Sequence, residues 1–137
     1  MIPQLKVKME KDAEILSLHM AVYYNNTTSV RHLLNSGANP NLSYGWADTP
    51  LFYLETDSPE IVKLLLAAGA NPDIRNIWNE TPLYLYIQNG YLQAAKILLL
   101  AGVNTNAKHK YGKTPLDIAK DYGSIKMVKL LKYYGAE

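Results

Sequence analysis

The fold is decided by residues 81–106, which read TPLYLYIQNGYLQAAKILLLAGVNTN. Threonine before proline is a good helix N-cap, and proline at the first helical position loses no hydrogen bond. An Asn-Gly turn separates this first helix from an aliphatic run, which ends at a glycine that can adopt the left-handed geometry of a helix end. The stretch therefore predicts two short helices followed by an extended, asparagine-rich loop.

The same pattern recurs along the chain at a period near 33 residues. Thr-Pro-Leu begins at Thr49, Thr81 and Thr114, and residues 16–21 (LSLHMA) form a degenerate first copy. The glycines that follow the aliphatic runs keep the same register, at Gly37, Gly69, Gly102 and Gly135. Self-similarity at this period indicates four units that stack side by side, because one unit cannot bury its apolar face alone.

The second unit is one residue shorter than the later ones. Thr-Pro-Leu and the closing glycine are 21 residues apart in the third and fourth units but 20 apart in the second. We place the missing residue in the turn at 56–59, because a turn can absorb a deletion without shifting the core face of either helix. Asp57 and Glu60 are expected to form a capping box where the next helix starts.

The Thr-Pro-Leu start, the helix ending in Leu-Leu-x-x-Gly-Ala and the Asn-x-Asn loop together resemble the ankyrin repeat, over roughly residues 16–137. The resemblance implies an all-α solenoid of helix-turn-helix units with projecting β-hairpin-like loops. We expect one domain, residues 1–137. Its expected parts are an N-terminal cap at 1–15 and repeats at approximately 16–43, 44–75, 76–108 and 109–137, the last acting as the C-terminal cap.

Two repeat positions depart from the family's pattern. The family's histidine after Thr-Pro-Leu is present only as His19. Its small alanine two positions later is replaced by Leu54 and Tyr86 in the middle repeats. These larger side chains predict bulkier packing in repeats two and three, with Tyr86 buried.

Composition excludes several classes of protein. The chain has no cysteine, so neither a disulfide framework nor a thiolate metal site is possible. Its apolar runs are too short to cross a bilayer, and its N-terminus lacks the apolar core of a signal peptide. The net charge of +2 is too small to indicate nucleic-acid binding. We therefore expect a cytoplasmic, monomeric protein without membrane contact.

No constellation of residues predicts catalysis. The three histidines, His19, His32 and His109, occupy different repeat positions and lack metal-ligand spacing, and no glycine-rich phosphate loop is present. Residues 44–60 hold four acids and no base, so a hydrolytic pair such as Asp57 with Glu60 is the enzyme alternative. A solvated acidic edge is the simpler interpretation. We expect no enzymatic activity, cofactor, metal or small-molecule substrate.

One large aromatic residue lies three positions before each threonine, at Trp46, Trp78 and Tyr111. The resemblance places these residues on the hairpin tips, which the family combines with the concave face of the first helices to bind partners. Repeats stack about 10 Å apart, so we expect the three rings to form a ladder of that spacing. Tryptophan and tyrosine are enriched at binding hot spots. A ring folded back onto its own loop is the alternative.

Charge varies along the same tips. The residue before each threonine is Asp48, Glu80 or Lys113. Residues 1–107 hold seven bases and nine acids (net −2), and residues 108–137 hold seven bases and three acids (net +4). Such a gradient would set the orientation and association rate of a partner of complementary charge. Further contacts are expected on the concave face, from Tyr23, Tyr53 and Gln88.

These observations predict a protein-binding module of adaptor or inhibitor type that uses the hairpin tips and the concave helical face. The first alternative is a structural spacer within a larger assembly. The second is phosphate or nucleic-acid binding at a basic tip formed by Lys108, Lys110 and Lys113.

Overall fold

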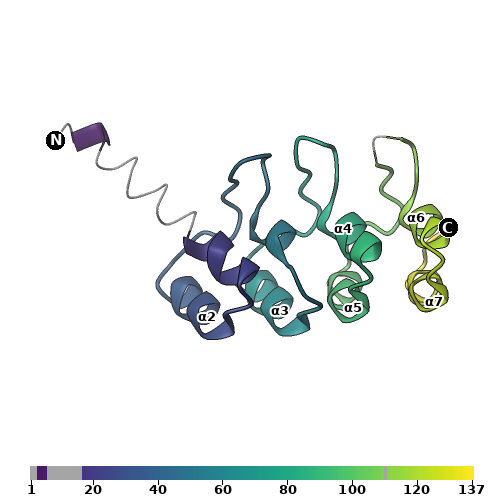
Figure 1. Cartoon of the computed structure of the whole chain (residues 1–137), viewed down its shortest axis with the longest axis horizontal. Coiled ribbons are helices and arrows are strands. Elements are labelled where there is room, and N and C mark those ends of the chain that lie inside the picture. Colours follow the sequence, from purple (N-terminus) through teal and green to yellow (C-terminus); the bar gives the residue numbers. More distant parts are fainter. Residues whose placement is uncertain (1–2, 6–16, 110) are drawn as a thin grey trace.

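The computed structural model describes residues 3–5, 17–109 and 111–137. In this part of the chain, helical hairpins stand side by side in a single row, and long loops project from one side of the row (Figure 1). The predicted all-α repeat architecture is confirmed. The expected N-terminal cap, residues 1–15, lies outside the described residues except for residues 3–5.

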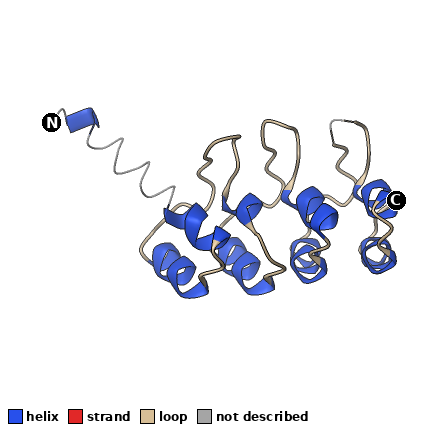
Figure 2. Ribbon diagram, in the orientation of Figure 1, coloured by secondary structure: helices blue, strands red, loops and turns tan. Residues whose placement is uncertain are grey.

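Each repeat contributes a first and a second helical element. Repeat one has a helix over residues 17–23 and α2 (Thr27–Asn35), and repeat two has η1 (Pro50–Tyr53) and α3 (Pro59–Ala67). Repeat three has α4 (Pro82–Asn89) and α5 (Leu92–Leu100), and repeat four has α6 (Pro115–Asp121) and α7 (Ile125–Tyr133). Loops and turns connect all of these elements (Figure 2).

Two layers of helices enclose a continuous apolar core. The second helices pack in the order α2, α3, α5, α7, and the first elements pack in the order η1, α4, α6. Leu65, Leu98 and Leu131 occupy one repeat position and are fully buried. Each repeat therefore buries its apolar face against its neighbours, as a solenoid requires. Within the described ranges, no helix has the length and apolar character needed to span a membrane.

The predicted threonine caps are confirmed in repeats three and four. The Thr81 hydroxyl accepts a hydrogen bond from the backbone N–H of Tyr84 at 3.3 Å. Thr114 and Asp117 form a reciprocal capping box, with bonds of 3.0 and 3.2 Å. These bonds satisfy backbone donors that the first turn of a helix otherwise leaves unpaired.

The first element of repeat two is different. η1 is a four-residue 3-10 turn, whereas α4 has eight residues and α6 has seven. The missing residue lies between Thr49 and the start of α3, as predicted, but the first helix is shortened as well, so the prediction that the turn at 56–59 alone absorbs it is wrong. The backbone N–H of Phe52 donates to the Thr49 carbonyl at 2.9 Å, as 3-10 geometry demands. The buried Thr49 hydroxyl has no hydrogen-bond partner among the described residues, so the predicted threonine cap is wrong for repeat two.

Tyr86 compensates for part of this irregularity. Its side chain is buried as predicted, and its hydroxyl donates to the backbone carbonyl of Leu51 in η1 at 2.6 Å. A carbonyl in so short a helix has few partners of its own, so this bond from repeat three satisfies it. Burial raises the pKa of the Tyr86 phenol far above its ordinary value, so it remains a neutral donor. Leu54, the other enlarged position, is also buried.

Asp57 caps a helix in the neighbouring repeat. The N-cap residue of α3 is Ser58, which makes no side-chain cap bond, so the predicted capping box of Asp57 with Glu60 is wrong. The Asp57 carboxylate instead accepts from the backbone N–H groups of Gln93 at 3.0 Å and Ala94 at 2.7 Å, at the start of α5. These are donors that a helix's own N-cap usually satisfies, and the negative charge suits the helix N-terminus.

A row of polar side chains joins the loops that follow the second helices. Asn41, Asp73 and Asn106 share one repeat position, and each side chain accepts a backbone N–H from the next repeat's loop, at 2.6, 3.0 and 3.0 Å. The recurring Asn-x-Asn pattern therefore does more than form turns. It links each repeat to the one that follows.

Candidate functional site

The three projecting loops share one construction. Each is closed by backbone hydrogen bonding between residues four apart: Tyr44 with Asp48, Asn76 with Glu80, and His109 with Lys113. Each contains a residue of positive φ at the same position: Ala47 (64°), Asn79 (58°) and Gly112 (73°). The central residues of the loops are Trp46, Trp78 and Tyr111, so the predicted aromatic positions lie at the tips.

Trp46 and Trp78 form a pair, which we call the tryptophan pair. Their ring centroids are 5.8 Å apart with an interplanar angle of 51°, and the side chains are 61% and 45% exposed. The two loops are joined directly, because the backbone N–H of Ile77 donates to the Trp46 carbonyl at 3.0 Å. The spacing of about 10 Å expected for the ladder is therefore wrong at its first step.

Tyr111 sits differently on the third loop. Its side chain is 75% exposed, and its ring lies 5.5 Å from that of His109 in the same loop. The Tyr111 backbone N–H donates to Nδ1 of His109 at 3.3 Å, and His109 also contacts the ring of Tyr84 at 4.2 Å. Tyr111 therefore packs partly on its own loop, which was the alternative interpretation for these aromatics.

Two carboxylates share one amide group beside the tryptophan pair. Nδ2 of Asn76 donates to Oδ1 of Asp48 and to Oε1 of Glu80, both at 3.0 Å. Oδ1 of Asn76 accepts from the backbone N–H groups of Trp78 and Glu80, also at 3.0 Å. The oxygen of the Asn76 amide therefore shapes the second loop, and its nitrogen binds both acids.

The environment of Asp48 disfavours its charged form. Burial raises the pKa of Asp48 above its ordinary value, and the nearby Glu80 carboxylate raises it further. The hydrogen bond from Asn76 and the proximity of His19 act in the opposite direction. Within the described ranges, neither Asp48 nor Glu80 forms an ion pair with a lysine or arginine. The pair of acids is thus held by a neutral group.

His19 supports the first loop from behind. It is fully buried, and its Nε2 donates to the backbone carbonyl of Asp48 at 2.8 Å. Its ring packs edge-on against Tyr53 at 4.7 Å. Burial raises the pKa of the half-buried Tyr53, and the Asp48 carboxylate adds to that rise. This predicted concave-face residue therefore adjoins the acidic pair.

The remaining predicted site residues lie elsewhere. Lys113 forms a salt bridge with Asp121, and Nε2 of Gln88 donates to the Tyr122 hydroxyl at 2.9 Å. Lys113, Tyr111 and Tyr122 line a hollow of about 270 Å³ beside repeat four. Tyr23, on the first helix of repeat one, is 42% exposed and packs against Tyr24. The structure thus brings Trp46, Trp78, Asp48, Glu80 and Tyr53 together. Tyr111 and Lys113 lie on the third loop, Gln88 lies beside Tyr122, and Tyr23 lies on the first helix of repeat one.

Comparison with known families agrees with this architecture. Residues 54–137 match a model of three ankyrin repeats, and residues 17–43 match a model of a single ankyrin repeat. The chain belongs to the ankyrin-repeat family. No curated protein matches it. Ankyrin repeats are generally protein–protein interaction modules and not enzymes, so the chain falls in a class of binding modules.

The two ankyrin matches leave residues 44–53 between them. This stretch contains the first projecting loop, with Trp46 and Asp48, and the 3-10 turn η1. A stretch that neither ankyrin model matches therefore contributes half of the tryptophan pair.

The acids of the enzyme alternative have scaffold roles in this ankyrin array. Asp57 caps α5, and Glu60 pairs with Arg31 at 3.0 Å on the surface. In the described part of the chain, no group of three histidine, aspartate or glutamate side chains is arranged to hold a metal ion. Both acids of the enzyme alternative are therefore engaged in contacts between neighbouring repeats.

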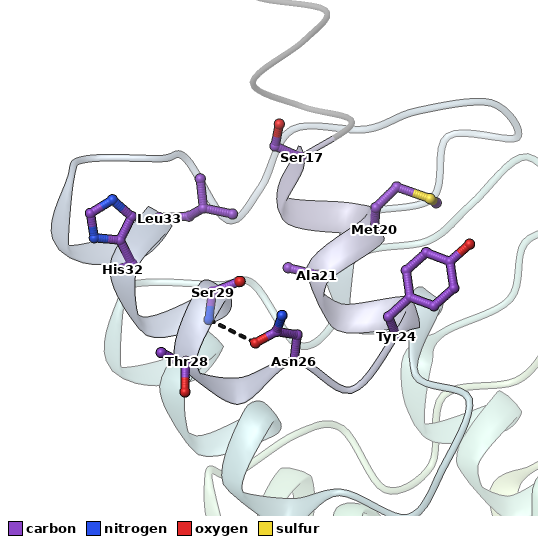
Figure 3. A pocket seen from close by; sticks show the side chains of 9 residues that line it. All are labelled: Ser17, Met20, Ala21, Tyr24, Asn26, Thr28, Ser29, His32 and Leu33. Atoms are coloured by element: carbon purple, nitrogen blue, oxygen red, sulfur yellow. Dashed lines mark hydrogen bonds between the residues drawn. The ribbon is translucent and has the colours of Figure 1, made fainter.

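A further hollow lies at the end of the described row of ankyrin repeats. It measures about 550 Å³ and lies between the helix over residues 17–23 and α2, lined by Met20, Tyr24 and His32 among others (Figure 3). Asn26, on its rim, accepts a hydrogen bond from the Ser29 backbone N–H and so caps α2. This is the face on which a further repeat would stack, and it contains none of the predicted site residues.

Sequence reasoning missed Asn76, which organises the site. Its signal was its repeat position, since Tyr44, Asn76 and His109 all begin a loop four residues before its closing residue. An asparagine there can accept from the backbone two and four residues later, as it does. That its amide also reaches Asp48 in the preceding loop depends on how the repeats stack.

Proposed function

We propose that this chain binds another protein through the surface formed by the loops at residues 44–48 and 76–80 and the adjoining concave face. The observation that carries the proposal is the tryptophan pair. Two neighbouring indoles, each about half exposed, present a large apolar surface to water. Tryptophan is the side chain type most enriched at the energetic centres of protein interfaces.

The loops that present the pair are already ordered by hydrogen bonds. The Trp46 carbonyl and the Trp78 backbone N–H are both engaged, by Ile77 and Asn76 respectively. A partner would therefore bind a surface that needs little further ordering, which lowers the entropic cost of association. The adaptor or inhibitor role, the monomeric state and the cytoplasmic location stay predictions from the sequence.

The two alternatives draw less support from the described residues. A structural spacer would leave the tryptophan pair without a role. Phosphate binding at the third loop would use Lys108, Lys110 and Lys113. The Lys113 ammonium is already paired with Asp121, and Lys110 lies outside the described residues.

Affinity capture with matched variants tests the proposal. We expect Trp78→Ala to weaken binding of a captured partner by about 2 kcal/mol, which is roughly 30-fold. Tyr133→Ala is the control, because Tyr133 is 82% exposed on α7, outside the proposed surface. Circular dichroism would verify that both variants are folded. Undiminished recovery with Trp78→Ala, or an equal loss with Tyr133→Ala, would contradict the proposed surface.

A further inference from the structure

The surface around the tryptophan pair carries an excess of acidic charge that the scaffold does not neutralise. Residues 44–80 hold six acids and two bases. Three of these acids have roles in the fold: Asp57 caps α5, Glu60 pairs with Arg31, and Asp73 accepts from Asn104. Asp48 and Glu80, by contrast, share the neutral Asn76 amide.

The bases of this stretch do not supply the missing charge. Lys63 lies on α3, in the layer of second helices. The Arg75 guanidinium donates to the backbone carbonyls of Asn79 at 3.1 Å and Lys108 at 2.9 Å, and so ties the second loop to the third. Among the described residues, no lysine or arginine is therefore paired with either acid, and a cation of a partner could supply this charge.

The spacing of the two acids suits a forked donor. Oδ1 of Asp48 and Oε1 of Glu80 each lie 3.0 Å from the same nitrogen atom, so they cannot be more than 6.0 Å apart. Arginine presents five N–H donors in a rigid plane and can bond to two carboxylate oxygens at once. Lysine offers a compact and strongly hydrated charge without this fork.

The indoles supply the second half of an arginine site. A guanidinium stacks on the face of an aromatic ring, best on tryptophan, and is more weakly hydrated than an ammonium. Trp46 and Asp48 come from one closed loop, with one residue between them, and Trp78 and Glu80 come from the next in the same way. Hydrogen bonds from Ile77 to Trp46 and from Asn76 to Asp48 hold the loops together.

We propose that this surface binds an arginine side chain presented by an extended segment of the partner protein. The guanidinium lies against the tryptophan pair and directs its N–H groups to Asp48 and Glu80. This inference rests on the proposed function and narrows it to one partner chemistry. An acidic segment would be repelled by the same two carboxylates, and an apolar segment would leave both without a counter-charge.

Intrinsic fluorescence is a direct test, because Trp46 and Trp78 are the only tryptophans of the chain. The full chain would be titrated at low ionic strength with a capped Gly-Ser-Arg-Ser-Gly peptide. Matched peptides would carry lysine, or citrulline, the neutral isostere of arginine, in its place. We expect a saturable change with the arginine peptide at millimolar concentration or below, and binding at least tenfold weaker with citrulline. Added salt should weaken the arginine binding.

Charge-neutralising variants test the two acids. Asp48→Asn and Glu80→Gln keep the shape of each side chain and should each weaken arginine-peptide binding about tenfold or more. Glu60→Gln removes the same charge on α3 and should leave the binding unchanged. Burial raises the pKa of Asp48, so the fold disfavours the charged carboxylate. The neutral Asp48→Asn variant should therefore unfold at the same denaturant concentration as the parent chain or a higher one. A loss of binding in that variant could not then be attributed to misfolding.

Three outcomes would overturn the inference. They are the absence of a saturable signal up to about 10 mM peptide, equal binding of the arginine and citrulline peptides, and undiminished binding by both acid variants. Capture of a partner that depends on Trp78 but not on Asp48 or Glu80 would also overturn it, while leaving the proposed function intact. Capture that is indifferent to Trp78 would instead remove the proposed function itself.

Discussion

The junction between repeats two and three differs from that between repeats three and four in both scaffold and surface. At the first, η1 has only four residues, the buried Thr49 hydroxyl lacks a partner in the described structure, and Asp48 and Glu80 share a neutral donor. At the second, α4 and α6 are full helices, and Lys113 is neutralised by Asp121. The less regular junction carries the tryptophan pair.

This difference agrees with the proposed binding surface. A scaffold usually satisfies its buried polar groups and pairs its charges, and departures from that consistency tend to lie at functional sites. Side chains that cross this junction in both directions stabilise it: Tyr86 of repeat three bonds to Leu51, and Asp57 of repeat two caps the start of α5. The regular junction needs no such support for its helices.

The largest expected effect comes from Tyr86→Phe. This change leaves the Leu51 carbonyl without its buried donor, so we expect a loss of about 2 kcal/mol in the free energy of unfolding. Tyr122→Phe is the matched change at the regular junction, where the hydroxyl accepts from Gln88 in an exposed position. That variant should lose about 0.5 kcal/mol or less. Urea denaturation followed by circular dichroism measures both, and equal losses would erase the distinction between the junctions.

Asp57→Ala is expected to have the next largest effect. It removes both side-chain acceptors from the start of α5, whose own N-cap residue Tyr91 makes no side-chain bond. Loss of a cap typically costs about 1 kcal/mol. Asp121→Ala breaks only the exposed salt bridge with Lys113 and should cost about 0.5 kcal/mol or less. The same denaturation experiment compares them, and a smaller loss for Asp57→Ala would show that the inter-repeat cap is dispensable.

The smallest effect is expected from Ala47→Gly at a loop tip. Ala47 adopts φ 64° at the position where the third loop has Gly112 at φ 73°. Left-handed geometry costs an L-residue roughly 1 kcal/mol. Glycine avoids this cost but gains conformational freedom in the unfolded chain, so Ala47→Gly should stabilise the fold by about 0.5 kcal/mol. Gly112→Ala should destabilise it by about 1 kcal/mol, although an added Cβ would meet no atom within 4 Å. Changes of the same sign in the melting temperatures would refute this account.

Much of the fold could be predicted from the sequence because it is periodic. The Thr-Pro-Leu starts and closing glycines locate the repeats, and Thr81 and Thr114 cap their helices as local chemistry requires. The central aromatic residue of each loop also follows from repeat register alone. The prediction for the short second repeat was wrong because counting residues locates a deletion but does not show which helix changes its structure. The 3-10 turn forms where Tyr86 of the next repeat can bond to it.

The sequence by itself determined the number of units, their order and which side chains reach the loop tips, since these depend on contacts within about one period. Only the tertiary structure decided that Asp57 caps a helix 36 residues further along, and that Asn76 joins Asp48 to Glu80. It also decided that two indoles meet at 5.8 Å while Tyr111 turns to His109. Such contacts depend on the offset and tilt between stacked repeats, which the packing of the whole core sets and no single repeat encodes.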